Sequence, residues 1–396
     1  MVPLPEIHTQ TTHLLHTHPS PLIAVFVGGT SGIGTHTVLA LASAHAKNST
    51  QPLLVFIVGR NKDAATTIIA ECRKVCPHGD FRFVQARDLS LLKDVDRVCQ
   101  EIRGMLDERE KEKGGKAWID LLVLTQGVLT LSRNGKFVFH LSPFLLISSS
   151  LRFSFPEVIY TNLTEITATK EGLDSTYSLM YYSRMRFITQ LLPLLLCSPL
   201  PSRVISILNP KLHGKLIPDD LSLRKHSIPR YASSHVCWMT TFFMEKIAEA
   251  NPGMISLMHV YPGVVMTDML EKGDAPRWLK WLWRFGLAPV MRFWETKGEV
   301  CGERILWLMS ERWRPRGVGG VREEERERKD GLRSVELVNA VDGTPGGGMY
   351  NVGSVGERYP TPKMYQKYKE DGAAEVVWKH TMDAFKVIEE GGVFQG

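Results

Sequence analysis

The sequence has few cysteines, no long apolar stretch and no concentration of positive charge. Its six cysteines include no Cys-x-x-Cys pair, so we expect buried thiols in a reducing, cytoplasmic setting and no metal site. The formal charge of +6 is small for 396 residues, and no basic stripe carries interleaved aromatics. A nucleic-acid partner is therefore not expected. No run approaches the ~20 apolar residues of a membrane-spanning helix.

The first twenty residues are polar and contain His8, His13, His16 and His18 together with three prolines. They lack the basic start and the apolar block of a signal peptide. A metal site built from these histidines is one interpretation of the stretch. The other, which we favour, is a disordered tail over residues 1–20.

The most informative stretch is a strand-like apolar run that leads into closely spaced glycines. Val25–Val27 is followed by Gly-Gly-Thr-Ser-Gly-Ile-Gly, and helix-forming residues continue to about Ala46. Glycines permit a sharp turn and a close approach of backbone to a ligand, and the free amides of a helix start suit a pyrophosphate. We therefore predict that a nucleotide cofactor is bound by Gly28, Thr30, Ser31, Gly32, Ile33 and Gly34.

A second apolar run, Leu53–Val58, ends in Gly59-Arg60-Asn61. In a dinucleotide fold the second strand ends beside the adenosine ribose, where an acidic residue would bind a free 2′-hydroxyl. Here a cation, Arg60, follows, and a cation suits the 2′-phosphate of NADP(H). We predict that Arg60 and Asn61 contact the cofactor. The alternative is that Arg60 is a solvated loop residue.

Two more strand ends complete the pattern. The third strand, 81–85, precedes Asp88-Leu89, where the carboxylate can accept from the adenine amino group or cap the next helix. A fourth run, 118–124, ends in Thr-Gln-Gly at Gly127. Strands that alternate with helices in this way predict a Rossmann-type α/β fold. Its doubly wound parallel sheet has helices on both faces, and a C-terminal helical extension follows.

With these pieces in place the sequence resembles the short-chain dehydrogenase/reductase superfamily. The resemblance covers Leu22–Asp268 and includes the glycine turn, Asp88-Leu89, Gly127 and a Tyr-Pro-Gly-Val-Val-Met-Thr phrase that starts at Tyr261. It implies NADP(H) as cofactor, with contacts from Asp88, Leu89, Gly127, Pro262, Gly263, Val265 and Thr267. The phrases at 171–174, 181–187 and 377–381 resemble divergent fungal reductases, several of them from secondary metabolism.

The catalytic positions of the family are atypical in this sequence. The family's Tyr-x-x-x-Lys corresponds to Tyr231 and His235, one helical turn apart, and a neutral histidine helps the phenol less than a lysine would. By resemblance Tyr231 is the proton donor and His235 a ribose or tyrosine contact. The family serine falls near Leu208-Asn209, so Ser206 or Asn209 is the replacement hydroxyl or amide. Tyr182 with Arg186 is an alternative phenol–cation pair, although surface or core packing of these residues is favoured.

Residues 135–170 fit neither a helical nor a strand period, and the resembling proteins pass almost directly across this point. We hypothesise a translated intron; the alternative is a lid over the substrate. The Trp-rich stretch Pro276–Met309 is interpreted as an apolar pocket wall, with a membrane-interface role as the alternative. A homo-oligomer and a peripheral membrane contact are left open.

We divide the chain into a tail (1–20), an NADP(H)-binding catalytic domain (21–312), an exposed charged and Gly-rich loop (313–346), and a last strand with C-terminal helices (347–396). The resemblance implies an oxidoreductase that moves a hydride between nicotinamide and a ketone or secondary alcohol of a mainly apolar metabolite. The alternative is a catalytically degenerate NADP(H)-binding protein.

Overall fold

The computed structural model describes residues 2–113, 115–127, 132–133, 136–137, 168–226, 228–265, 281, 283–287, 295–317 and 337–396. Its centre is a seven-stranded parallel sheet in the order β3-β2-β1-β4-β7-β8-β9. The strands are β1 (Leu22–Val27), β2 (Leu53–Gly59), β3 (Asp80–Gln85), β4 (Leu121–Leu124), β7 (Ser202–Ile207), β8 (Ile255–Val260) and β9 (Met349–Val352). The order confirms the doubly wound Rossmann-type prediction.

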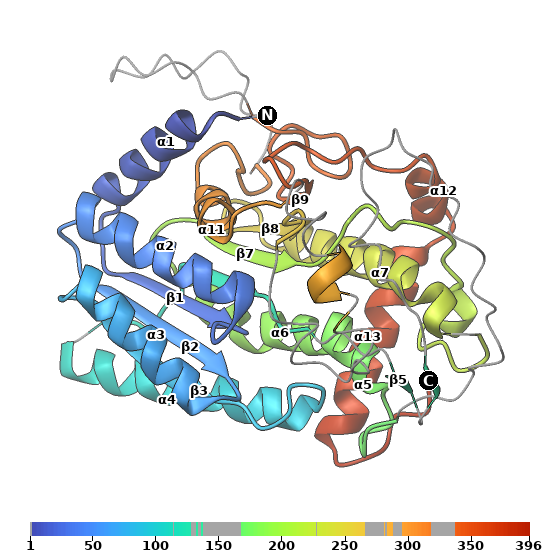
Figure 1. Ribbon diagram of the computed structural model, residues 1–396. Coiled ribbons are helices and arrows are strands. Elements are labelled where there is room, and N and C mark those ends of the chain that lie inside the picture. The colour runs from blue at the N-terminus through green and yellow to red at the C-terminus, as the bar shows by residue number, and fades with distance from the viewer. Residues whose placement is uncertain are drawn as a thin grey trace.

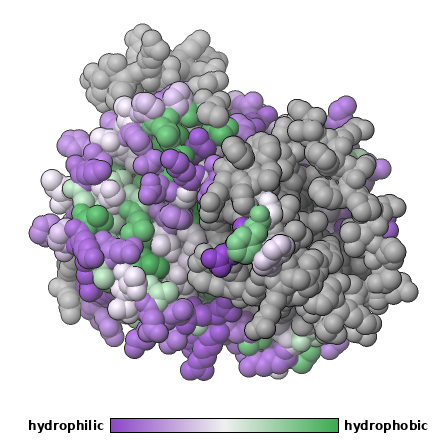
Figure 2. All heavy atoms as spheres, viewed as in Figure 1, coloured by the Kyte–Doolittle hydropathy of each residue, from purple (hydrophilic) through white to green (hydrophobic). Residues whose placement is uncertain are grey.

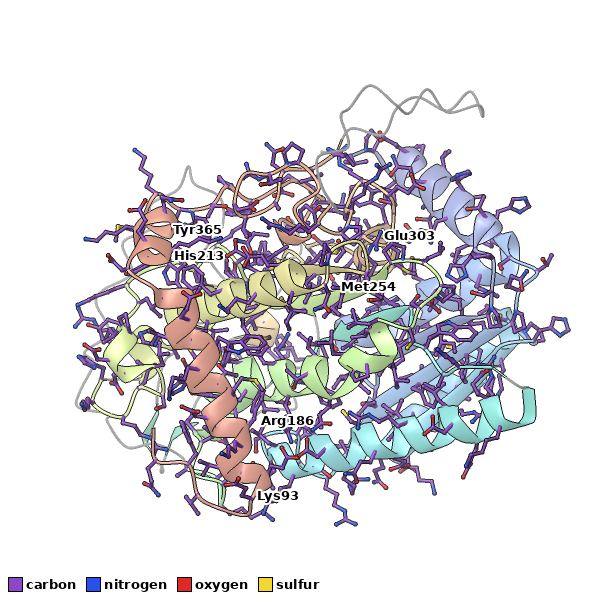
Figure 3. The ribbon with its side chains drawn as sticks, turned by 180° about the vertical axis from the view of Figure 1, so that it is seen from behind. Lys93, Arg186, His213, Met254, Glu303 and Tyr365 are labelled. Atoms are coloured by element: carbon purple, nitrogen blue, oxygen red, sulfur yellow. The ribbon has the colours of Figure 1, made fainter. Side chains whose placement is uncertain are left out.

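Helices cover both faces of the sheet (Figure 1). One face carries α1 (Leu4–Thr17), α2 (Gly32–Asn48), α3 (Lys62–Val75) and α11 (Gly298–Trp307). The other face, seen from behind in Figure 3, carries α4 (Leu92–Lys113), α6 (Ser183–Leu195), α7 (Ile228–Ala250) and α13 (Ala373–Glu389). Shorter elements are β5 (Ser132–Arg133), β6 (Lys136–Phe137), α5 (Ser175–Tyr177), η2 (Ser178–Tyr182), η3 (Pro218–Asp220), η4 (Trp283–Leu287) and α12 (Met364–Glu370).

Six of the seven strands are buried along their whole length, and β1, β2 and β4 are continuous apolar runs. The edge strand β3 alternates apolar and polar residues and is partly exposed. All six residues of β1 are buried. Val25 and Val27 pack into the core on the α4–α6–α7 side, whereas Ala24 and Phe26 pack into the core on the α2–α3–α11 side. Two apolar layers therefore hold the sheet, as expected for parallel strands. The outer surface over α2 and α3 is mainly hydrophilic (Figure 2).

The prediction of a disordered tail over residues 1–20 is wrong, because α1 forms there and packs on α2 and α11. Ile7 and Leu15 are buried in the core beneath it. The Trp307 indole donates to Gln10 Oε1 at 2.6 Å, and His8 lies 3.1 Å from Glu303. The apolar spacing of Leu4, Ile7 and Leu15 is helical, and this signal was hidden by the prolines and histidines around it.

The prediction that residues 313–346 form an exposed loop is wrong at the two ends of this range that the structure describes. Trp313 is fully buried between Trp307 and Tyr350, with ring centroids 5.7 and 5.4 Å away. Val341 donates to Met349 O at 2.9 Å, so this segment covers the edge strand β9. Residues 318–336 lie outside the described residues. The last strand and the C-terminal helices are confirmed as β9, α12 and α13.

Of the predicted insertion, 135–170, the structure describes 136–137 and 168–170. Lys136–Phe137 pairs antiparallel with Ser132–Arg133. The rest lies outside the described residues, so the intron and lid hypotheses stay predictions. Among the described residues, no helix is long and apolar enough to cross a membrane.

Candidate cofactor and active site

The turn after β1 forms a tight cradle at the carboxyl edge of the sheet. Gly28 has φ 85°, and a Cβ there would lie 2.5 Å from Thr125 Oγ1. A Cβ on Gly34 would lie 2.4 Å from Gly28 O, so the first turn of α2 presses against the turn itself. Ser31, the residue before α2, makes no capping hydrogen bond with its side chain. The amides of the first helical turn are therefore left for an anion, as the sequence predicts.

The end of β2 lies against this cradle. A Cβ on Gly59 would meet the Thr30 side chain at 2.4 Å. Arg60 follows and is exposed, and its guanidinium forms no ion pair within the described residues. Asn61 Oδ1 accepts from the amide of Ala64 at 3.0 Å. Asn61 is thus committed to capping α3, and Arg60 is the available cation.

The predicted Asp88-Leu89 pair divides in the structure. Asp88 is exposed and accepts from the amide and the hydroxyl of Ser90, at 2.9 and 2.7 Å, whereas the Leu89 side chain is buried in the core. The alternative role predicted for Asp88, capping α4, is filled by Glu171, which accepts from Leu92 N at 2.6 Å and Lys93 N at 3.0 Å. Glu171 lies 79 residues after Leu92 in the sequence, and sequence analysis missed this cap.

The carboxyl ends of β4 and β7 are joined by a buried arginine that sequence analysis did not single out. Arg184 is 1% exposed and donates to Leu124 O (3.0 Å), Gln126 O (2.5 Å) and Ile207 O (3.0 Å). It also donates to Ser206 Oγ at 2.9 Å. The Ser206 hydroxyl therefore points into the core. This contradicts its predicted role as the active-site serine, because strand alternation turns it away from the edge.

Asn209, the other candidate at this position, lies just beyond the end of β7. It is 3% exposed, and its Oδ1 accepts from Lys211 N at 3.0 Å. Its carbonyl faces the Cys237 thiol on α7 at 3.0 Å. The side chain thus shapes the turn after β7, and its role as a donor to substrate stays a prediction.

Tyr231 and His235 lie one turn apart on α7, with ring centroids 6.5 Å from each other. Tyr231 is partly exposed and contacts His226. His235 is fully buried, and its Nε2 accepts from Ile217 N at 3.1 Å. Burial lowers the His235 pKa to about 4, so the imidazole is neutral near pH 7. A ring at that depth does not support the predicted ribose contact, although its proximity to Tyr231 stands.

The alternative pair, Tyr182 with Arg186, is not formed. The Tyr182 hydroxyl lies 2.7 Å from His380 Nε2 in the core, whereas Arg186 pairs with Asp96 at 2.6 Å. Tyr182, the last residue of η2, and Arg186 in α6 both pack against α13, where they contact His380 and Phe385. Arg186 is visible from behind in Figure 3. Of the two favoured alternatives, surface and core packing, the structure shows core packing for both side chains.

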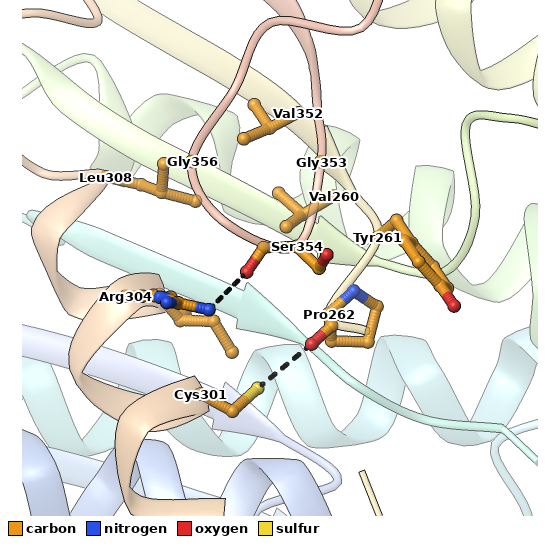
Figure 4. Close-up of a pocket in the computed structure, with 11 residues that line it drawn as sticks. Val260, Tyr261, Pro262, Cys301, Arg304, Leu308, Val352, Gly353, Ser354 and Gly356 are labelled. Carbon is orange, nitrogen blue, oxygen red and sulfur yellow. Dashed lines mark hydrogen bonds between the residues drawn. The ribbon is translucent and has the colours of Figure 1, made fainter. Parts of the chain in front are cut away.

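The Pro-Gly turn after β8 closes the carboxyl edge from another side. Gly263 has φ 85°, and a Cβ there would lie 2.6 Å from Thr296 Oγ1. Val265 is partly buried against the α2–α3–α11 core, and Thr267 lies outside the described residues. A small pocket lies between Pro262, α11 and the turn after β9 (Figure 4). Arg304 donates to Ser354 O across it at 2.9 Å.

The tryptophans predicted to form a pocket wall are divided in the structure. Trp307 is fully buried under α1, so its predicted place in the wall is wrong. Trp281 and Phe285 are 65% and 62% exposed, with ring centroids 5.6 Å apart. Trp278 and Trp294 lie outside the described residues.

Several buried polar atoms at this edge have no hydrogen-bond partner within the described part of the chain. They include both amide atoms of Gln126, both ring nitrogens of His259 and both amide atoms of Asn351. His259 is the register neighbour of both Ser206 and Asn351. Unpartnered buried polar groups are rare and point to bound water or ligand. Gly127, one residue past Gln126, is exposed.

No cluster of metal-ligating side chains occurs among the residues that the structure describes. The sheet order and the glycine cradle define a Rossmann-type α/β fold. No family model matches the chain. The comparison with curated proteins does identify relatives along almost its whole length.

The short-chain dehydrogenase/reductase SAT2 of Stachybotrys chartarum is 31% identical over 370 residues, which cover 92% of this chain and 91% of SAT2. The oxidoreductase andH of Emericella variicolor is 29% identical over 385 residues, covering 96% of each chain. The protein therefore belongs to the short-chain dehydrogenase/reductase family of oxidoreductases. The solved RhlG/NADP complex of Pseudomonas aeruginosa aligns with a TM-score of 0.46 at 17% identity, covering 74% of this chain and 91% of that one. That likeness is too slight to support a conclusion about this chain.

Proposed function

We propose that this protein is an NADP(H)-dependent oxidoreductase that moves a hydride between nicotinamide and a ketone or secondary alcohol of a mainly apolar metabolite. The observation that carries the proposal is the cradle formed by Gly28 and Gly34, with an uncapped helix start and Arg60 beside it. The residues fit the cofactor: amides for a diphosphate, and a cation for a 2′-phosphate.

When bound, the nicotinamide supplies or accepts the hydride. The residues of the chain bind the cofactor and supply or accept the one proton that the reaction transfers. We assign to Tyr231, which is partly exposed at the start of α7, the donation of a phenolic proton to the carbonyl oxygen that the hydride reduces. Because His235 is neutral, it does not lower the phenol pKa as a lysine would.

A second candidate function is favoured by a specific observation. Ser206 is occupied by Arg184, and His235 is buried, so two of the family's catalytic positions are altered. A catalytically degenerate protein that binds NADP(H) without turnover would show this pattern. Turnover of ketones by the wild-type chain and by Tyr231→Phe distinguishes the two. Loss of turnover with retained NADPH binding in Tyr231→Phe supports the enzyme. Tight binding without any wild-type turnover supports the degenerate protein.

The cofactor assignment is tested by titrating NADPH and NADH, followed by fluorescence, into the wild type and Arg60→Glu. A charge-assisted contact to phosphate is worth about 1.5–3 kcal/mol, so NADPH affinity should fall at least ~10-fold while NADH affinity holds. Lys74→Glu reverses an exposed cation at the other end of α3 and is the matched control. An NADPH-to-NADH affinity ratio that is the same in Arg60→Glu as in Lys74→Glu would overturn the 2′-phosphate assignment.

A further inference from the structure

Arg184 is a buried charge without a carboxylate partner within the described residues. Its hydrogen bonds all go to carbonyl or hydroxyl oxygens. Arg186, two residues further along α6, pairs instead with Asp96 and Glu389. Burial lowers the Arg184 pKa to about 9, which still leaves the guanidinium charged near pH 7. Burying a charge without a counter-ion is costly, and such costs concentrate at functional sites.

The two segments that Arg184 joins are the ones expected to face cofactor and substrate. On one side it holds Gln126 O, next to Gly127, the predicted cofactor contact at the end of β4. On the other it holds Ile207 O, two residues before Asn209. The side-chain amide of Gln126 is buried and has no hydrogen-bond partner within the described residues. Such a group points to a further partner, a water or a ligand, beside the 125–127 segment.

The local sequence explains how an arginine reaches this place. The five-residue π-helical turn η2, Ser178–Tyr182, immediately precedes α6. The Arg184 Nε donates back to Leu179 O in this turn at 3.2 Å. Single π-helical turns widen a helix and re-aim the side chains that follow, and they are frequent at functional sites.

We propose that Arg184 is a positioning residue that holds the 125–127 and 207–209 segments in the geometry that cofactor and substrate require. This inference rests on the proposed function for the identity of those ligands. Its conformational part concerns the chain alone, so it can be tested without any ligand.

The first test is amide hydrogen exchange on the unliganded full chain, comparing the wild type with Arg184→Gln, Arg184→Lys and Arg203→Gln. Arg203 is the matched control, because it is also buried and its guanidinium also donates to carbonyls, those of Pro201 and Ser202, but at the amino end of β7. Exchange at 125–127 and 207–209 should accelerate roughly 10-fold or more in Arg184→Gln. Arg184→Lys should recover part of the protection, since an ammonium still reaches some of these oxygens.

The second test is NADPH binding and ketone turnover by the same proteins. Misplacing the two segments should lower kcat/KM by about 100-fold in Arg184→Gln, mostly through kcat, and Arg184→Lys should be intermediate. Arg203→Gln should lower the melting temperature without these losses. If Arg184→Gln does not fold, Arg184→Lys carries the test against Arg203→Gln.

The positioning role is overturned if exchange at the two segments is unchanged in the Arg184 variants, or rises equally in Arg203→Gln. Failure of the proposed function looks different: the wild type itself then neither binds NADPH nor reduces ketones. In that case the exchange comparison still decides whether Arg184 holds the edge.

Discussion

Asp120 and Gln126 flank the same strand, β4, and both are buried, yet their surroundings differ completely. At the amino end, Asp120 accepts from Ile23 N (2.7 Å), Trp118 Nε1 (3.1 Å) and Ser198 Oγ (2.6 Å). At the carboxyl end, neither amide atom of Gln126 has a partner among the described residues. The Asp120 end of β4 is therefore scaffold. The Gln126 end, where the glycine cradle and Arg184 also lie, is where we expect a ligand.

The largest effect is expected from a substitution that fills the glycine cradle at the carboxyl edge of the sheet. Gly34→Val places atoms against Gly28 O, which even a Cβ would meet at 2.4 Å, and should reduce NADPH affinity by about 100-fold or more. Gly104→Ala is the control, since a Cβ there meets nothing within 4 Å. It lies in α4 and should stabilise the fold by about 0.5–1 kcal/mol. Fluorescence titration and chemical denaturation measure the two effects. Unchanged NADPH affinity in Gly34→Val would contradict the cradle.

The next largest effect is expected from a substitution at the amino edge of the sheet, which should lower the free energy of unfolding. Asp120→Ala leaves one buried donor, Ile23 N, and two partly buried donors, Trp118 Nε1 and Ser198 Oγ, unpaired, so the free energy of unfolding should fall by roughly 3–5 kcal/mol. NADPH affinity of the folded fraction should hold within about twofold, because this end is remote from the cradle. Asp80→Ala removes a partly exposed pair with Arg82 and should cost less than ~1 kcal/mol. Urea denaturation checks both; equal losses would show that the amino edge is not a special scaffold.

The effect expected for each single residue is smaller when pH is changed. Burial lowers the pKa of His45, His213, His235 and His380 to about 4, below the 6.5 of an unfolded histidine. The unfolded chain therefore binds more protons between these values. Stability should be fully present above about pH 6.5 and be lost as pH falls toward 4, by roughly 1–2 kcal/mol for each imidazole between pH 7 and 5.

Thermal or urea unfolding at several pH values measures this slope. His213→Gln should reduce it, whereas the exposed His16→Gln should leave it unchanged. A protein equally stable at pH 5 and pH 7 would contradict the neutral buried histidines.

The parts of the candidate site that could be predicted from the sequence are those that depend on short, contiguous patterns. The strand–turn–helix at Gly28–Gly34, Arg60 after the second strand, and the alternation that gives the sheet all depend on neighbours in sequence. What it missed depends on contacts across the fold. Arg184 becomes a site residue only because β4 and β7 end beside α6, and Ser206 is turned inward by strand pleating. Glu171 caps α4 from a distant segment.

The burial of His235 was equally hidden, because its depth is set by the 211–217 segment folding over α7. The helix α1 was missed for a different reason. Its apolar spacing is helical, whereas the prolines and histidines of the same stretch are typical of a disordered tail, so period and composition predict different structures.

Amide hydrogen exchange of the wild type, with and without NADPH, tests most directly whether the carboxyl edge of the sheet holds the cofactor. We expect NADPH to protect 28–34, 59–61, 125–127 and 262–265, and to leave 118–120 and 198–203, at the amino edge, unprotected. Protection confined to other segments, or no protection at saturating NADPH, would show that the cofactor does not bind at the carboxyl edge.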